Sequence, residues 1–144
     1  MSTEENKAFA RRLYQTFDQV FRTGNLELFN EVIAIDFIDH NPTPGQGPGL
    51  EGIKPVFGAF RAAFPDLHFH VENQIAEGDQ VVSRITLHGT HKGDFQGIPA
   101  TGKPVMQEGI DIVRIANGKV VERWGLFDNL GLLQQLGAIP PPPG

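Results

Sequence analysis

The chain has 144 residues, of which 40% are hydrophobic and 9% aromatic, and its formal net charge at pH 7 is −5. This length fits one domain with a substantial core. The negative charge argues against nucleic acid as a partner, because phosphate contacts need clustered Lys and Arg, and the absence of Cys excludes disulfides and thiolate-based sites.

We expect neither a signal peptide nor a membrane span from the sequence. Residues 1–12 are rich in charge and lack the apolar stretch of a signal peptide. Elsewhere, no apolar run approaches the about 18 residues that a membrane span needs. We therefore expect a cytoplasmic protein without membrane contacts that acts on a small molecule.

The first predicted elements are two helices. Apolar residues recur at three- and four-residue steps over residues 4–22, which is typical of an amphipathic helix. Gly24 then supplies a helix stop, and Asn25 supplies an N-cap. A short second helix is expected over residues 25–34.

A short strand and a third helix follow. Residues 36–40, DFIDH, read as the strand, and the next segment is a loop dense in Pro and Gly. The third helix is expected over residues 52–64. Pro55 fits this helix only in its first turn, because proline lacks the N–H that a helix interior requires.

After Pro65 the apolar period changes from helical to alternating, which predicts antiparallel strands. A turn at Asn117-Gly118 joins the last two of them, and Gly137 ends a final helix. The expected elements are strands over 67–77, 80–91, 105–115 and 120–127 and a helix over 128–136. The Pro-rich tail, 138–144, is expected to be extended or disordered.

This order of elements predicts an α+β fold in a single domain over residues 1–144. Helices come first and a meander of strands follows, so the helices should cover one face of an antiparallel sheet. The sheet must curve strongly to wrap around the N-terminal helices. We expect a conical apolar cavity between the two layers, where a small, apolar ligand would bind.

Two motifs are set aside. Residues 97–103, GIPATGK, approach a phosphate-binding loop, but Pro104 lacks the required hydroxyl and the segment joins two strands. His68 and His70 share one strand face, which Glu72 and Gln74 extend, so solvent exposure is the favoured interpretation. We predict no metal site.

Asp111 is the most unusual residue of the predicted sheet. It lies in GIDIVRI, where both strand faces are largely apolar. Burial of an unpaired carboxylate is costly, so Asp111 should have a partner or a raised pKa. A structural ion pair with Arg114, Arg84 or Arg123 and a role as a cavity acid are both open.

Several other polar residues are candidates for the cavity. His91 either is a buried structural residue or faces the cavity and exchanges a proton with a ligand. His40 and Asn41 precede the Pro-rich loop, where an amide is placed to hold a carbonyl or enolate oxygen. Tyr14 either packs in the core or donates into the cavity, and Trp124 suits a core or wall position.

Asp128 stands immediately before the final helix. Aspartate is among the best N-cap residues, worth about 1 kcal/mol over alanine. We favour the cap as its main role and leave a second role at the cavity rim open.

These stretches together resemble the SnoaL-like polyketide cyclase family, within the nuclear-transport-factor-2-like superfamily. The residues that carry the resemblance are DFIDHNPTPG (36–45), FPDLHFHVE (64–72), THKGDFQGIPATGK (90–103), GIDIVRIANGKVVERW (109–124) and LLQQLG (132–137). The resemblance implies a curved sheet wrapped around helices and a homodimer or higher homo-oligomer. It also implies an intramolecular aldol ring closure without cofactor or metal, in which a carboxylate moves a proton while amide and His groups stabilise the enolate.

The resemblance assigns roles to individual residues. The family's Asn before Pro matches Asn41, its His in T-H-x-G matches His91, and a polar residue on its third strand matches Asp111. The family's catalytic Asp follows the position of Trp124, where this chain has Gly125. A glycine cannot transfer a proton, so either Asp111 or Asp128 substitutes, or the chemistry is different or absent.

Three functional hypotheses follow. The first is a cofactor-independent cyclase or isomerase for a small, largely apolar carbonyl or polyketide-like compound, with Asp111 and Asp128 as acid/base groups, His91 as a donor, and His40 and Asn41 as orienters of the oxygen. Its expected substrate-binding residues are Tyr14, Phe17, Phe57, Phe60 and Trp124. The second is a non-catalytic small-molecule binder, which Gly125 favours. The third is an epoxide hydrolase, which would require an Asp-Arg-Asp relay.

Overall fold

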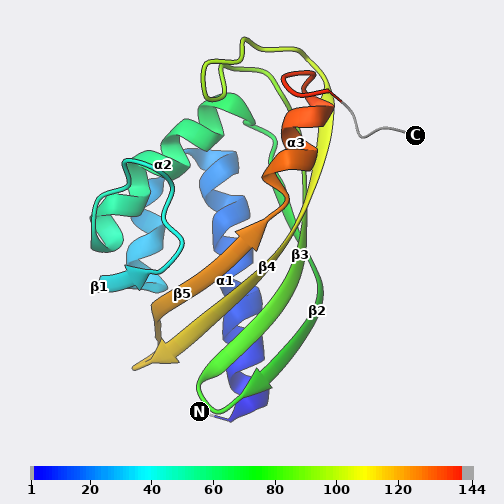
Figure 1. Cartoon of the computed structure of the whole chain (residues 1–144). Helices are drawn as coiled ribbons and strands as arrows, with labels where there is room; N and C mark the ends of the chain where they lie inside the picture. The colour runs from blue at the N-terminus through cyan, green and yellow to red at the C-terminus, as the bar shows by residue number, and fades with distance from the viewer. Residues whose placement is uncertain (1, 141–144) are drawn as a thin grey trace.

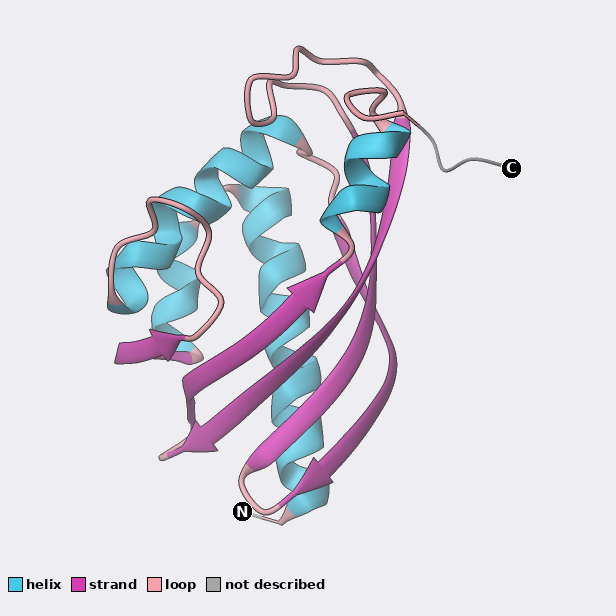
Figure 2. Ribbon diagram, in the orientation of Figure 1, coloured by secondary structure: helices cyan, strands magenta, loops and turns pink. Residues whose placement is uncertain are grey.

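The computed structural model describes residues 2–140. Its elements are α1 (Thr3–Thr23), the 3-10 helix η1 (Leu26–Glu31), β1 (Ile33–Asp39), α2 (Gly49–Ala63), β2 (His68–Glu77), β3 (Gln80–Thr90), β4 (Pro104–Ala116), β5 (Lys119–Phe127) and α3 (Asn129–Gln135). Helices α1 and α2 lie on the same side of a curved sheet (Figure 1). The helices and the strands form two layers (Figure 2), so the predicted α+β fold is confirmed.

The sheet has the strand order β1-β5-β4-β3-β2. Strands β2 to β5 form the predicted antiparallel meander, and the Asn117-Gly118 turn has positive φ at both residues, as a type I′ hairpin requires. Strand β1 pairs in parallel with β5, which makes the sheet mixed. This pairing places Asp39 beside Arg123, and it determines the chemistry of the cavity described below.

The prediction of a helix over 25–34 was wrong for its last three residues, 32–34. Asn25 does cap a helical segment, since its side chain accepts from the N–H of Glu27 at 3.2 Å, but η1 ends at Glu31. Strand β1 begins at Ile33, and the N–H of Val120 donates to the carbonyl of Val32 at 2.8 Å. The β-branched residues here favour strand over helix, and pairing with β5 stabilises that choice.

Helix α2 begins earlier than predicted, so Pro55 lies inside it and not in the first turn. Leu50 and Ile53 are buried, and their packing extends the helix toward its N-terminus. The carbonyl that Pro55 deprives of a hydrogen bond belongs to Glu51, which is exposed to solvent. Water can therefore satisfy it.

A β-bulge in β2 changes which side chains point inward. The register with β3 shifts between Val71 and Asn73. As a result Ile75, which the alternation predicted to share a face with Val71, is 64% exposed. Gln74, predicted on the solvated face, turns inward and donates to Ser83 Oγ at 3.1 Å. His68 and His70 precede the bulge and are exposed as predicted.

Two apolar clusters form the core. The larger one lies between α1, η1, α2 and the sheet, and its aromatic rings include Phe17, Phe29, Phe57 and Phe69. The smaller one lies under α3. The predicted helix stop is confirmed, since Gly137 follows α3 in a left-handed conformation. The Pro-rich tail is mostly outside the described residues.

None of the helices among residues 2–140 has the length and apolar character needed to cross a membrane.

Candidate functional site

A cavity of about 230 Å³ lies between the helices and the concave face of the sheet. Its walls are largely apolar, and Phe17, Phe57 and Phe60 are in the wall as predicted. Their contact with a ligand stays a prediction. Polar side chains gather where β1, β4 and β5 meet. These are Asp39, Asn41, Gln107, Asp111, Arg123 and Asn129, together with Thr43 and Gln46 from the loop after β1.

Two carboxylates share one guanidinium at this polar end. Arg123 on β5 donates from Nε to Asp111 Oδ1 on β4 at 3.0 Å. Its Nη2 lies 2.9 Å from the same oxygen. Its Nη1 lies 3.2 and 3.3 Å from the two carboxylate oxygens of Asp39 on β1. The three groups therefore carry one formal negative charge when all are ionised, next to apolar walls.

Asp111 is both paired and part of the cavity, so the two interpretations left open by its sequence are compatible. The residue is 6% exposed. Burial raises the pKa of the Asp111 carboxyl, and the charge of Asp39 adds to this, although Arg123 and the hydrogen bond from Tyr14 oppose it. For Arg123, burial alone would lower the pKa, but the charges of Asp111 and Asp39 outweigh it and the pKa is raised. The guanidinium stays charged.

Tyr14 lies behind Asp111. Its hydroxyl donates to Asp111 Oδ2 at 3.3 Å. Burial, followed by the charge of Asp111, raises the pKa of Tyr14 well above its usual value. The phenol is therefore neutral and serves as a donor to the carboxylate. It supports Asp111 from the core instead of facing a ligand directly.

Asn41 is oriented by the backbone of β5. Its Oδ1 accepts from the N–H of Gly125 at 2.9 Å. Since a backbone N–H can only donate, the amide oxygen must point to Gly125 and the Nδ2 group is the remaining donor. Asn41 also lines the cavity, which is the position that its place before the Pro-rich loop suggested.

Gly125 leaves space that the ion pair fills. It pairs directly with Asp111 in the sheet. A Cβ at position 125 would collide with Asp111 Oδ1 and Arg123 Nη2. The absence of a side chain at position 125, where the resemblance implies an acid, is therefore a steric requirement of the Asp111–Arg123 pair.

His91 lies outside the cavity. It is fully buried beside Phe64, with ring centroids 5.5 Å apart. Its Nδ1 accepts from the N–H of Thr101 at 3.2 Å and lies 2.9 Å from Thr101 Oγ1. This arrangement is the buried, hydrogen-bonded alternative that the sequence left open.

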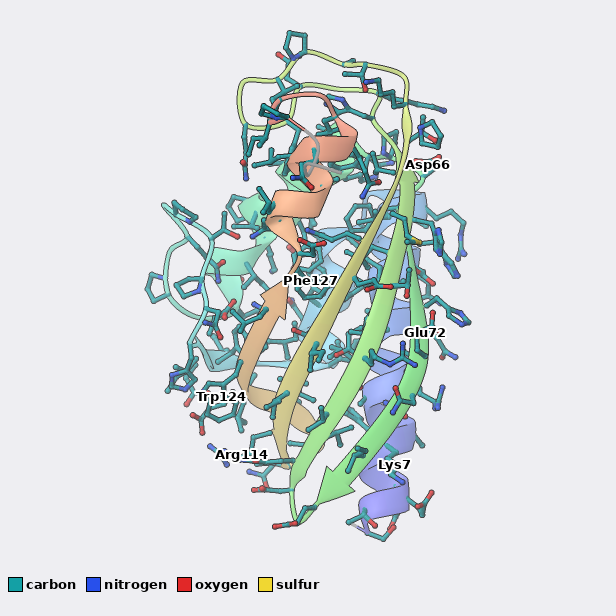
Figure 3. All side chains as sticks on the ribbon, turned by 45° about the vertical axis from the view of Figure 1, so that its right-hand side comes forward. Lys7, Asp66, Glu72, Arg114, Trp124 and Phe127 are labelled. Atoms are coloured by element: carbon teal, nitrogen blue, oxygen red, sulfur yellow. The ribbon has the colours of Figure 1, made fainter. Side chains whose placement is uncertain are left out.

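Trp124 and His40 lie on the outer face of the sheet, so Trp124 is not in the cavity wall. Because side chains alternate along a strand, the inward position of Arg123 and Gly125 turns Trp124 outward. The His40 and Trp124 rings stack with centroids 4.6 Å apart and planes 4° apart. His40 Nε2 lies 2.8 Å from Glu122 Oε2. Trp124 and Phe127 are marked on β5 in Figure 3.

Asp128 is the N-cap of α3, as predicted. Its Oδ1 accepts from the N–H of Gly131 at 2.9 Å. The residue borders a second, more open depression on the outer face and does not line the cavity.

The sequence did not identify Asp39, Gln46 or Asn129 as site residues, and it considered Arg123 only as an ion-pair partner. Gln46 Nε2 donates to Asp39 Oδ2 at 3.2 Å, and Gln107 Nε2 donates to Asn129 Oδ1 at 2.9 Å. Asp39 directly precedes His40 and Asn41, which were predicted as site residues. This neighbourhood was the available signal for Asp39 in the sequence. The parallel pairing of β1 with β5, which brings it to the cavity, has no local signature in the sequence.

Comparisons with known proteins agree with this fold and confirm the resemblance. The model of the SnoaL-like polyketide cyclase family matches residues 11–136. The chain is 29% identical over 131 residues to aklanonic acid methyl ester cyclase DnrD of Streptomyces peucetius, covering 87% of this chain and 88% of that protein. It is 31% identical over 121 residues to nogalonic acid methyl ester cyclase of Streptomyces nogalater, covering 81% and 89%.

The structure of TsrD from Streptomyces laurentii is also similar. Its TM-score is 0.80 at 29% identity, over 92% of this chain and 97% of that one. This protein therefore belongs to the SnoaL-like polyketide cyclase family.

Proposed function

We propose that the protein is a cofactor-independent cyclase- or isomerase-type enzyme that moves a proton next to a carbonyl group of a small, largely apolar compound. The observation that carries this proposal is the buried Asp111 carboxyl in the lining of an apolar cavity. A carboxyl whose pKa is raised by burial is a stronger base than one in water, and this suits it to abstract a proton from carbon.

The two oxygens of Asp111 have different roles in this proposal. Oδ1 is engaged by Arg123. Among the described residues, Oδ2 accepts one hydrogen bond, from Tyr14 at 3.3 Å. Oδ2 is therefore the oxygen that takes the proton, while Arg123 holds the carboxylate in place.

The reaction begins when Asp111 Oδ2 removes a proton from the carbon next to a carbonyl. The electron pair of the C–H bond moves into the carbonyl group, and Asn41 Nδ2 stabilises the resulting enolate oxygen. In a cyclisation, the enolate carbon then bonds to a second carbonyl carbon of the same molecule. The proton held by Asp111 goes to the new alkoxide oxygen, which leaves a hydroxyl and an ionised carboxylate. Asp128 caps α3 and His91 does not line the cavity, although His91 Nε2 is buried without a hydrogen-bond partner among the described residues, so neither has a role in this proposal.

The cavity favours a compact substrate. Its volume of about 230 Å³ is below the about 300–1,000 Å³ of typical small-molecule pockets. The named relatives are cyclases of aklanonic acid methyl ester and nogalonic acid methyl ester. We propose a substrate of the same chemistry, a carbonyl compound or ester with an acidic C–H, with the apolar part against Phe17, Phe57 and Phe60.

A screen of ketones, esters and epoxides tests the proposal. Each compound is assayed for turnover and for thermal stabilisation of the protein. Asp111→Asn should reduce kcat/KM by about 10²-fold or more, the usual contribution of a general base. Asp128→Asn is the matched control and should be neutral. Unchanged kinetics in Asp111→Asn would contradict the assignment, and stabilisation without turnover would favour a non-catalytic binder.

Epoxide hydrolysis is a second candidate, favoured by the Asp39–Arg123–Asp111 chain. In that reaction one carboxylate takes a proton from water, the water oxygen bonds to an oxirane carbon, and the C–O bond breaks. The other carboxyl gives its proton to the oxirane oxygen, which completes a diol. Incorporation of ¹⁸O from labelled water into a diol would distinguish this reaction from isomerisation of the same epoxide.

A further inference from the structure

Asp39 is the most heavily hydrogen-bonded carboxylate of the cavity. Its Oδ1 accepts from the N–H of Asn41 at 3.0 Å, and its Oδ2 accepts from Gln46 Nε2 at 3.2 Å. Both oxygens also face Arg123 Nη1 at 3.2 and 3.3 Å. With donors on each oxygen, Asp39 is held firmly in place, and in the proposed cyclase it acts through Arg123 and not on the substrate.

The contacts of Asp39 change how Arg123 meets Asp111. An arginine and a single carboxylate commonly form two parallel hydrogen bonds, one to each oxygen. Here Asp39 binds Nη1 and so fixes the orientation of the guanidinium. In this orientation Nε donates to Asp111 Oδ1 and Nη2 lies 2.9 Å from the same oxygen. Asp111 Oδ2 is thereby left to the Tyr14 hydroxyl and the cavity.

We propose that Asp39 is a positioning residue for Asp111. By binding one end of the Arg123 guanidinium, Asp39 leaves Asp111 Oδ2 available for proton transfer. It also divides the positive charge of Arg123 between the two carboxylates. This inference rests on the proposed role of Asp111 as the proton-transferring group. Nothing in the resemblance or the motifs assigned a role to Asp39.

The charged groups around Asp111 also support a positioning role for Asp39. The titratable groups that face Asp111 are Arg123 from β5, Asp39 from β1 and Tyr14 from α1, with the uncharged Ser83 beside them on β3. Arg123 stabilises the ionised form of Asp111, and the negative charge of Asp39 opposes it. If the charge of Asp39 is removed, Arg123 has Asp111 as its remaining carboxylate partner. The ionised form of Asp111 is then stabilised more strongly, and the pKa of Asp111 should fall.

The test compares Asp39→Asn with Asp36→Asn. Both variants remove one negative charge from β1, but Asp36 is exposed and does not line the cavity. The pKa of Asp111 is measured directly in each by ¹³C NMR of the side-chain carboxyl, which needs no substrate. The pH dependence of kcat/KM is measured in parallel with any substrate found in the screen.

In Asp39→Asn we expect the pKa of Asp111 to fall and the ascending limb of the kcat/KM profile to move to lower pH. Asp36→Asn should leave both unchanged. An unchanged or raised pKa of Asp111 in folded Asp39→Asn would overturn the inference. A lowered pKa in a protein that turns over nothing would support the positioning role and count against the proposed enzyme instead.

A structural role for Asp39 is tested by folding. If Asp39→Asn does not fold, Asp39→Ser, which also removes the charge, replaces it in the titration. Failure of both variants to fold would overturn the positioning role in favour of a purely structural one.

Discussion

At the scale of single residues, the site depends on how Gly125, Asp111 and Arg123 share a small volume. Gly125 faces Asp111 across the β4–β5 ladder. The carboxylate and the guanidinium fill the space that a Cβ of residue 125 would take. The missing side chain is thus part of the arrangement that holds the buried acid, and it is no argument for an inert cavity.

Gly125→Ala should therefore displace the Asp111–Arg123 pair. We expect a loss of about 1–3 kcal/mol in the free energy of unfolding, the usual cost of overpacking, together with reduced turnover. Gly58→Ala is the control, because its added Cβ meets Leu26 at an ordinary 3.9 Å and lies in a helix, where alanine is favoured over glycine. Urea denaturation of both variants checks this. Equal stability of Gly125→Ala and wild type would show that the pair has room to move.

Asp111 should also make stability depend on pH. Burial raises its pKa in the folded state above the unfolded value of about 3.9. Its contribution to the free energy of unfolding is then fully present below that pH and is lost as pH rises through the folded pKa. The unfolding free energy of wild type minus that of Asp111→Asn should decrease as pH rises from the unfolded to the folded pKa of Asp111. Above the folded pKa this difference should no longer depend on pH. A difference independent of pH would contradict the raised pKa.

At the scale of elements, local patterns predicted most of the fold and long-range pairing decided the rest. The alternation along β3, β4 and β5 and the Asn117-Gly118 turn were sufficient to predict the meander. The parallel addition of β1 and the bulge in β2 depend on contacts between segments far apart in sequence. The same distinction holds for the site. Asp111 and Asn41 were recognisable from their local context, whereas Asp39 reaches Arg123 only through β1.

The cap of α3 gives a prediction at this scale. Asp128→Ala should lower the free energy of unfolding by about 1 kcal/mol, because the N–H of Gly131 loses its acceptor. Asp128→Asn should retain both stability and activity, since asparagine caps as well as aspartate and the residue borders the outer face. Thermal denaturation and the turnover assay check both. Loss of activity in a stable Asp128→Asn variant would show that the residue acts in catalysis.

At the scale of the whole molecule, the sheet has two unlike faces. The concave face encloses the cavity, whereas the outer face carries apolar side chains in water. Ile110 is 50% exposed and Leu126 is 74% exposed, and both border a depression shared with Ile112 and Trp124. Exposed apolar surface of this kind is typical of an interface.

The resemblance implies a homodimer or higher homo-oligomer, and we propose that two copies of the chain associate through this outer face. Leu126→Lys should then weaken the association by placing an unpaired charge in the interface. Ile35→Lys is the control, because Ile35 is 79% exposed on β1 and does not border the depression. Sedimentation velocity gives the mass of each species. A wild-type protein that stays monomeric at high concentration would refute the proposed dimer.

The stacking of His40 on Trp124 has a practical consequence. Trp124 is the single tryptophan of the sequence, so the intrinsic fluorescence of the protein above 295 nm excitation comes from one indole. His40 lies between Asp39 and Asn41, which both line the cavity. Any ligand that shifts those two neighbours will change the imidazole–indole contact and the emission with it. We therefore expect the emission of Trp124 to report occupancy of the cavity, which a fluorescence titration without a label would check.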